Sequence, residues 1–314
     1  MDALAEVLQL SRITGCVLAR VRAQEPWGIQ LAPVRGAAVH AITAGTCWLR
    51  IAGDAPRRLM PGDVVLLPSG SPHALISAAD GPTRTFDQVT KEQLLTPDGD
   101  LVVSGPGAAT CFLCATYSYD HEVTQPLLSL LPPVLHIAAS DREGDSPVQS
   151  TLRLLSAELG RRGVGTRTVV DRLIDVLFVH VVRQWLDRGE SDATASWIRG
   201  LRDPAIAKVL AVLHGRPAEP WTLESIAQEA HLSRSTLARR FSDRVGEPPL
   251  AYLTRWRMDL AARLLRETDE AVGEVGRRVG YESEFAFSRA FARVRGVAPG
   301  RYRRSHRAST QRAS

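Results

Sequence analysis

The chain has 314 residues, which is long enough for two domains with buried cores. Its 44% hydrophobic and 23% charged residues are ordinary for a globular protein, and no apolar run reaches the length of a membrane span. The first residues lack the basic segment of a secretory leader, so we expect a cytoplasmic protein without a membrane partner, whose four cysteines are reduced.

The net charge of +5 is unevenly distributed. Residues 200–314 carry 21 basic and 13 acidic side chains, whereas the preceding residues carry 18 and 21. An excess of cations in one part of a chain is typical of a surface that meets a polyanion, although a solvated arginine-rich face has the same composition. Charge alone leaves both interpretations open.

Short β-type segments alternate with Pro, Gly, Asp and Ser clusters over the first 120 residues. Short strands at this spacing predict a sandwich or barrel. The predicted strands are 16–21, 47–53, 63–68, 73–78 and 109–120.

Two amphipathic helices follow, at 146–162 and Thr166–Arg188. The apolar surface of the second helix is wide, so we interpret the pair as a helical hairpin that also contacts a second subunit. Core packing within one chain explains the same pattern equally well. The polar segment 189–196 marks the start of a linker.

The remaining chain contains one motif twice. The first copy, "WTLESIAQEAHLSRSTLARRFSDRVG", has a short helix, a tight turn and a second helix that begins after Ser233. With Leu237 and Phe241 facing inward, this second helix is exposed and able to enter a major groove. Its outward residues are Arg234, Ser235, Ala238 and Arg239.

The second copy, "AVGEVGRRVGYESEFAFSRAFARVRG", places Gly280 in the turn and Ser283 before its second helix. The amphipathic segment Pro249–Glu267 connects the copies and is predicted to fix their spacing, because two reading helices on one face of a duplex lie about 34 Å apart. The outward residues are Glu284, Phe285, Ser288 and Arg289.

The segment "VGYESEFAFSRAFARVRGVAPGRYRR" closely resembles the C-terminal signature of the AraC/XylS family of transcription regulators. The resemblance implies double-stranded DNA as a partner, RNA polymerase as a further partner of an activator, and base contacts at the outward residues of both copies. Arginine pairs bidentately with guanine, so Arg239 and Arg289 are the principal candidates. The candidates for phosphate contacts or a solvated face are Arg240, Arg293, Arg295, Arg301, Arg303 and Arg304.

The segment "GDVVLLPSGSPH" resembles the second cupin motif, which ends here at His73. Of the first cupin motif only His40 is present, since Ile42 replaces the second histidine and Thr46 and Cys47 stand where glutamate is expected. A catalytic metal needs about three protein ligands. We therefore expect no metal, no other cofactor and no enzyme activity, but buried histidines and a ligand pocket lined by His40, Trp48 and His73.

Cys111 and Cys114 lie on a predicted strand, where no helix N-terminus lowers a thiol pKa. Together with Cys16 they resemble the cupin-sensor branch of the AraC/XylS family, which includes a regulator that detects reactive chlorine. That resemblance places two sensing cysteines at Cys16 and Cys114. Inert buried thiols are the alternative.

The sequence thus predicts an α+β multidomain protein. The predicted parts are a cupin-like β-barrel sensor domain at 1–140, a helical hairpin with a candidate homodimer contact at 141–188, a linker at 189–203, an all-α double helix-turn-helix domain at 204–306 and a disordered tail at 307–314. The predicted function is a DNA-binding transcription regulator that responds to an oxidant or a small molecule. The alternatives are a metal-dependent cupin enzyme fused to a DNA-binding module and a DNA-bending protein.

Overall fold

The computed structural model describes residues 13–34, 36–96, 99–119, 131–139, 146–161, 163–188, 200 and 203–311. The chain divides into two compact units, which we describe separately. The N-terminal unit contains Arg12–His121 and Leu127–Glu190, and the C-terminal unit contains Ser191–Ser314. Within the described residues, no helix combines the length and the apolar character that crossing a membrane requires.

The strands of the N-terminal unit form two sheets that do not close into a single barrel. A six-stranded sheet has the order β11-β6-β3-β10-β1-β9, and a five-stranded sheet has the order β5-β4-β7-β2-β8. The strands of the first sheet are β1 (Thr14–Gln24), β3 (Ala37–Ala44), β6 (Val64–Leu67), β9 (Asp100–Val103), β10 (Ala109–Ser118) and β11 (Leu135–Ile137). Those of the second are β2 (Gly28–Leu31), β4 (Cys47–Ile51), β5 (Arg57–Leu59), β7 (His73–Ile76) and β8 (Arg84–Phe86).

The two sheets enclose an apolar core because alternate side chains of each strand point to the same face. Val21 and Ala23 of β1, Leu49 of β4, Leu75 of β7 and Phe112 of β10 all belong to this core and are almost fully buried. The helices of this unit are α2 (Gln88–Leu94), α4 (Pro147–Gly160) and α5 (Thr166–Arg188).

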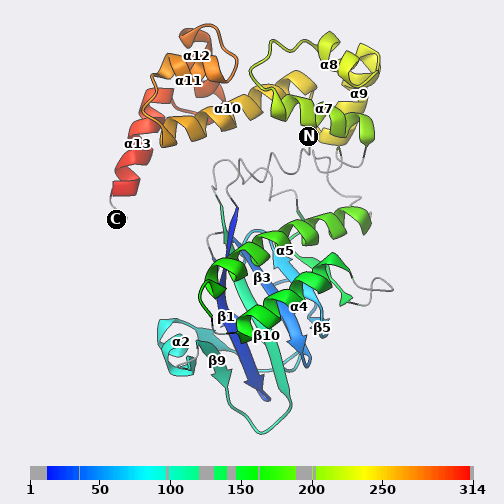
Figure 1. Ribbon diagram of the computed structural model, residues 1–314, viewed down its shortest axis with the longest axis vertical. Helices are drawn as coiled ribbons and strands as arrows, with labels where there is room; N and C mark the ends of the chain where they lie inside the picture. Colours follow the sequence, from blue (N-terminus) through cyan, green and yellow to red (C-terminus); the bar gives the residue numbers. More distant parts are fainter. Residues whose placement is uncertain are drawn as a thin grey trace. The chain divides into compact units, whose positions relative to one another are not determined.

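Helices α4 and α5 pack together and lie in front of β1, β3 and β10 in Figure 1. Helix α5 approaches β1 closely because Gly15 has no side chain: a Cβ there would lie 2.1 Å from Ile174. The Tyr117 hydroxyl donates a hydrogen bond to the Ile174 carbonyl at 2.7 Å, and the Gly15 amide donates to Asp175 at 2.8 Å. The helical hairpin is therefore fixed to the outer face of the six-stranded sheet.

The C-terminal unit is helical. In Figure 1, helix α10 runs from the pair α8 and α9 to the pair α11 and α12. Asp203 caps α7 through its carboxylate, and Pro249 begins α10, where a missing amide hydrogen costs nothing. The helices are α7 (Pro204–Gly215), α8 (Leu223–Glu229), α9 (Arg234–Val245), α10 (Pro249–Glu267), α11 (Val272–Arg278), α12 (Glu284–Arg295) and α13 (Pro299–Gln311).

The predicted fold class is confirmed, with a β-rich N-terminal part and a helical C-terminal part. One correction concerns the barrel, which is a pair of sheets. A second concerns the end of the chain, since α13 continues to Gln311, inside the segment 307–314 that was predicted to be disordered. The predicted linker, 189–203, lies almost entirely outside the described residues.

Candidate functional site

The first helix-turn-helix consists of α8 and α9. Thr222 and Ser225 form a reciprocal capping box at the start of α8, so serine performs the role that glutamate or glutamine usually has. The Ser233 hydroxyl accepts a backbone N–H at the start of α9. Leu237 and Phe241 lie on the inner face of α9 and are fully buried, so the opposite face of this helix points outward.

The second helix-turn-helix consists of α11 and α12 and repeats this construction. Ser283 caps α12, and Phe287 and Phe291 are fully buried beneath it. Gly276 allows α11 to pack closely, because a Cβ at this position would lie 3.1 Å from the Phe287 ring. A Cβ at Gly273 would lie 2.6 Å from a carboxylate oxygen of Glu284, but that side chain is exposed and can move away.

The two turns differ in length. Each contains one residue in the left-handed region, His231 with φ of 54° in the first and Gly280 with φ of 87° in the second. The first turn comprises residues 230–233 and the second comprises 279–283, so the second is one residue longer. A left-handed conformation is strained for histidine and unstrained for glycine.

The structure places the predicted DNA-contacting residues on the outer faces of α9 and α12. The exposed ones are Arg234, Ser235, Arg239, Glu284, Phe285 and Arg289, and the half-buried ones are Ala238 and Ser288. Both key arginines therefore have accessible side chains on corresponding faces of the two repeats.

Neighbouring side chains orient two of these arginines. The guanidinium of Arg289 lies 4.8 Å from the ring centroid of Phe285, a side chain that is 69% exposed although it is apolar. Arg234 lies 3.6 Å from Glu224 of α8 in an exposed ion pair. The cation–π contact holds the Arg289 guanidinium over the exposed ring.

Three of the six candidate phosphate-contacting arginines have structural roles instead. Arg240 donates two hydrogen bonds to Asp203, at 2.5 and 2.8 Å, and so anchors α9 to the start of α7. Arg295 has a side chain that is only 13% exposed and bonds to buried Asp259 at 2.6 Å. Arg303 donates to backbone carbonyls at and beyond the end of α10. The exposed members of the set are Arg293, Arg301 and Arg304.

The interior of the N-terminal unit contains a cavity of about 100 Å³ between the two sheets. Its lining is mostly apolar side chains, and the polar ones are His40, His73, Cys114, Thr116 and Lys91. Both histidines are almost fully buried. The predicted pocket residues His40 and His73 therefore do lie together.

These three side chains form one hydrogen-bonded chain. His73 Nδ1 lies 2.7 Å from the Ser71 carbonyl, His73 Nε2 lies 2.7 Å from His40 Nε2, and His40 Nδ1 lies 3.1 Å from Cys114 Sγ. A carbonyl only accepts, so His73 Nδ1 donates to Ser71. His40 Nε2 then donates to His73, and the Cys114 thiol donates to His40 Nδ1. When both histidines and the thiol are neutral, each of these hydrogen bonds has one donor and one acceptor.

The electrostatics agree with this neutral arrangement. Burial, followed by the influence of His73, lowers the pKa of His40 well below its ordinary value, and burial also lowers the pKa of His73. Burial raises the pKa of the Cys114 thiol to about 12, with a smaller contribution from Cys47. Cys114 is therefore a protonated thiol, which is a weak nucleophile.

The arrangement does not suit a metal ion. Two nitrogen ligands of one tetrahedral zinc lie about 3.3 Å apart, whereas the two Nε2 atoms of His40 and His73 are 2.7 Å apart and bonded to each other. Cys114 contacts the opposite nitrogen of His40, so its sulfur cannot join a metal between the rings. Among the described residues, no group of three or more His, Cys, Asp or Glu side chains has the arrangement of a metal site.

Three sequence-predicted sensor residues, Trp48, Cys111 and Cys16, are absent from the lining of the cavity. Cys47 and Leu49 of β4 face the core, so Trp48 between them faces outward and is absent from the cavity lining. The structure therefore does not bring Trp48, a predicted pocket residue, together with His40 and His73 in this cavity. Cys111 and Cys114 are three residues apart on β10 and therefore face opposite sides of the sheet.

Cys16 and Cys114 are diagonal neighbours on adjacent strands. Cys16 is paired with Thr116, two residues beyond Cys114 on β10, and a bulge between Val17 and Ala19 interrupts the pairing. Diagonal neighbours lie about 7–8 Å apart, which is beyond the usual span of a disulfide. Coupling these two cysteines directly would require the backbone to move.

Comparisons with known proteins agree with this architecture. Residues 2–187 match the family model described as Cupin, and residues 226–305 match the model described as Helix-turn-helix domain. The chain is 35% identical to a putative AraC-like transcription regulator of Streptomyces lividans, over 97% of this chain and 98% of that protein. It is also 28% identical to the RCS-specific HTH-type transcriptional activator RclR of Escherichia coli, over 96% of this chain and 97% of that protein.

A solved structure, the DNA-binding domain of AdpA in complex with a target DNA, is 37% identical with a TM-score of 0.33, and covers 34% of this chain and 96% of that chain. Both family models and the full-length similarity to the Streptomyces protein fit the two units described above. The chain belongs to the AraC-like transcription regulators and has an N-terminal cupin domain and a C-terminal helix-turn-helix domain that binds DNA.

Proposed function

We propose that α9 and α12 enter successive major-groove segments of one DNA duplex and that Arg239 and Arg289 make the principal base contacts. The observation that carries this proposal is the exposure of both guanidinium groups on corresponding faces of two repeats with the same buried frame. Each arginine has the fixed pair of N–H groups that matches the major-groove edge of guanine.

The neighbouring positions have lesser roles in this proposal. Ser235 and Ser288 donate or accept hydrogen bonds, Ala238 and Phe285 contact a thymine methyl group, and Glu284 accepts from cytosine. Arg234 contributes to the first reading face. The exposed arginines outside the reading faces contact phosphates, so binding weakens steeply with salt.

The test begins with selection of bound sequences from a random DNA pool by the full-length protein. Arg239→Ala and Arg289→Ala are then compared on the selected DNA by quantitative gel shift. Arg58→Ala, at an exposed position of β5, is the matched control. Each test variant should lose about 10- to 100-fold in affinity and relax discrimination in its own segment only. Unchanged affinity in both variants would contradict the proposal.

For the effector, we propose a small uncharged molecule that binds in the cavity of the N-terminal unit. The mostly apolar lining and the neutral Cys114–His40–His73 chain support an uncharged ligand, and Lys91 is the one cationic side chain of the lining. The volume of about 100 Å³ corresponds to roughly three water molecules, so the ligand is small or widens the cavity. His40→Phe should fill the cavity and abolish the effector response in a reporter assay while leaving DNA binding intact.

An oxidant is the second candidate for the effector. It is favoured by the contact between Cys114 and His40 and by the similarity to an RCS-specific activator. The high pKa of Cys114 predicts slow oxidation, because the thiolate is the reactive form. Mass spectrometry after hypochlorite treatment is the direct measurement. A normal reporter response in Cys16→Ser and Cys114→Ser proteins would eliminate this candidate.

The helical hairpin is the proposed homodimer contact. Val169 and Val176 are seven residues apart on α5 and are 44% and 42% exposed, so they form one apolar stripe. Val176→Asp should shift the sedimentation of the protein toward a monomer, whereas Val164→Asp in the preceding turn should leave it unchanged. Identical sedimentation of both variants would contradict a dimer through this face.

RNA polymerase is a further proposed partner, and transcription in vitro with the selected DNA tests whether the protein activates. The alternative of a metal-dependent cupin enzyme is tested by metal analysis of the purified protein. The curated relatives reported above are transcription regulators, which supports a protein without enzyme activity.

A further inference from the structure

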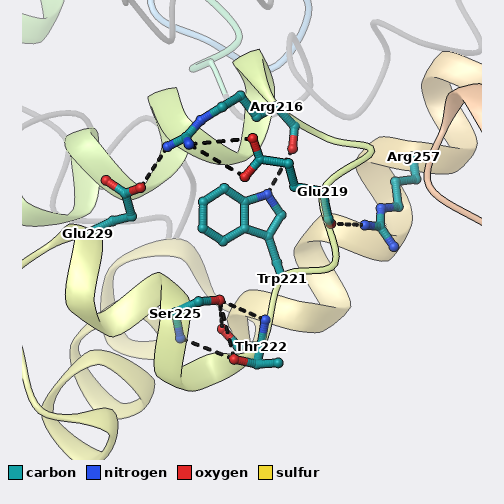
Figure 2. Close-up of polar contacts among 7 residues, drawn as sticks. All are labelled: Arg216, Glu219, Trp221, Thr222, Ser225, Glu229 and Arg257. Carbon is teal, nitrogen blue, oxygen red and sulfur yellow. Dashed lines mark hydrogen bonds and ion pairs between the residues drawn. The ribbon is translucent and has the colours of Figure 1, made fainter.

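The loop before the first helix-turn-helix, residues 216–221, is fixed to α8 by a polar cluster shown in Figure 2. Arg216 Nη2 donates to Glu229 of α8 at 2.7 Å, and its Nη1 lies 3.4 Å from both carboxylate oxygens of Glu219. The Trp221 indole N–H donates to the Arg216 carbonyl at 2.8 Å, and the Arg216 guanidinium lies 5.0 Å from the Trp221 ring centroid. The loop therefore moves together with the first helix-turn-helix.

Arg257 of α10 also donates hydrogen bonds to the backbone of this loop. Its Nε donates to the Pro217 carbonyl at 2.7 Å, and its Nη2 donates to the Glu219 carbonyl at 2.7 Å. Figure 2 shows the second of these bonds, with Arg257 reaching the loop from α10. Two bonds from one planar guanidinium define an orientation, whereas a single bond would allow rotation.

The turn of the second helix-turn-helix lies against the same place. A Cβ at Gly280 would be 2.7 Å from the Ala218 carbonyl oxygen and 2.9 Å from the Ala218 Cα. It would also be 2.9 Å from Arg257 Nη2. The guanidinium of Arg257 lies 5.7 Å from the ring centroid of Tyr281. The turn of the second repeat thus touches the loop that is bound to the first repeat, in addition to the sharing of α10.

We infer that Arg257 is a positioning residue that fixes the orientation of α12 relative to α9, and so sets the DNA spacing that the protein accepts. The inference rests on the proposed reading of DNA by both helices. Arg257 joins three parts at one point: the loop bound to the first repeat, the connecting helix, and the Gly280–Tyr281 turn of the second repeat. Without it, the second repeat is less restrained relative to the first.

Spacing discrimination follows from this restraint. When two linked modules are rigidly oriented, binding of one places the other at a high effective concentration over a correctly spaced site. An inserted base pair moves and rotates the second segment, and a rigid protein cannot follow it. A loosened protein gains tolerance for altered spacing and loses affinity for the optimal one.

The experiment uses the full-length protein and the DNA selected above. Three DNA sets are compared: the selected site, the same site with one or two base pairs inserted or removed between its segments, and the site with one segment scrambled. The proteins are the wild type, Arg257→Ala, Arg257→Lys and, as the matched control on the same helix, Arg263→Ala, whose side chain forms an ion pair with Glu267 within α10. Circular dichroism verifies folding, and the lysine variant carries the test if the alanine variant does not fold.

Arg257→Ala should bind the selected site about tenfold more weakly and lose most of its discrimination against altered spacing. Its affinity for DNA with one scrambled segment should equal that of the wild type. Arg257→Lys should fall between the two, because an ammonium lacks the planar fork. Arg263→Ala should behave as the wild type does.

Two results would overturn the inference. Unchanged spacing discrimination in Arg257→Ala and Arg257→Lys would show that the contact does not orient the repeats. An equal loss of affinity on DNA with one scrambled segment would show a local role in folding. If the wild type itself selects a site with only one segment, the proposed reading by both helices fails and this inference fails with it.

Discussion

In the first helix-turn-helix the strained residue of the turn is His231, and in the second the corresponding residue is Gly280. The buried frames are otherwise alike. Phe241 and Phe291 are both fully buried, and α9 and α12 both end at a left-handed glycine, Gly246 or Gly296. The frames have kept their packing residues, whereas the turns and the outward faces have diverged.

In each repeat a tyrosine hydroxyl also contacts another helix, but the residue that it contacts differs. The Tyr252 hydroxyl bonds to His214 at 2.6 Å in the first, and the Tyr302 hydroxyl accepts from Arg266 at 2.7 Å in the second. In both repeats a buried tyrosine hydroxyl joins the helix after the helix-turn-helix to the helix before it, although the partner residue differs.

The largest effects should come from the shared frame. Phe241→Ala and Phe291→Ala should each lower the free energy of unfolding by about 3–5 kcal/mol, because each removes a fully buried ring. Chemical denaturation measures both, with Leu250→Ala, at a position that is 42% exposed, as the control. A mild effect at one phenylalanine only would show that the two frames are not equivalent.

The turns should respond in opposite ways. Gly280→Ala should cost at least ~2 kcal/mol, because alanine is strained at positive φ and its Cβ would meet backbone atoms 2.7 Å away. His231→Gly should change the stability by less than ~1 kcal/mol, since relief of strain offsets the added freedom of the unfolded chain. Thermal denaturation of the two variants measures the difference. Equal losses would contradict the distinction between the turns.

The outward faces of α9 and α12 should prefer different DNA sequences, but their arginines should contribute similar free energies of discrimination. Arg239→Ala and Arg289→Ala should each cost about 1–3 kcal/mol of discrimination, at separate segments of the DNA. A double variant should lose the sum, because the two contacts are distant and independent. Selection experiments with each variant reveal which segment has relaxed. Relaxation of one and the same segment in both variants would disagree with two separate reading helices.

The smallest effect should come from Phe285, whose ring lies beside Arg289 on the outward face of α12. Phe285→Ala should weaken DNA binding by roughly 0.5–1 kcal/mol, which is the range for an exposed cation–π contact. It should leave the stability nearly unchanged, since the ring is 69% exposed. Gel shift and thermal denaturation on one preparation test both statements. A large loss of stability would mean that the ring supports the fold.

Much of the helical architecture could be predicted because its signals are local. The bounds predicted for α5 and α10 are those observed, since both are long and periodic. The serine caps at Ser233 and Ser283 identified where the reading helices begin. Strand β3 was missed because it is buried at nearly every position and shows no alternation.

Other features depend on residues that are distant in the sequence. The structural roles of Arg240 and Arg295 require Asp203, the N-cap of α7, and Asp259 of α10, and both pairs are distant in the sequence. The contact between Cys114 and His40 follows from the pairing of β10 with β3, because these two residues are directly opposite each other. A single sequence contains no record of such pairings, so the positions were recognised as candidates but their partners were not.

The additional residue in the second turn has a consequence for the engineering of specificity. A graft that exchanges only α9 and α12 would place each helix after the turn of the other repeat, which differs from its own turn by one residue. Chimeric regulators should therefore be cut so that each turn travels with its own helix, at 230–245 and 279–295.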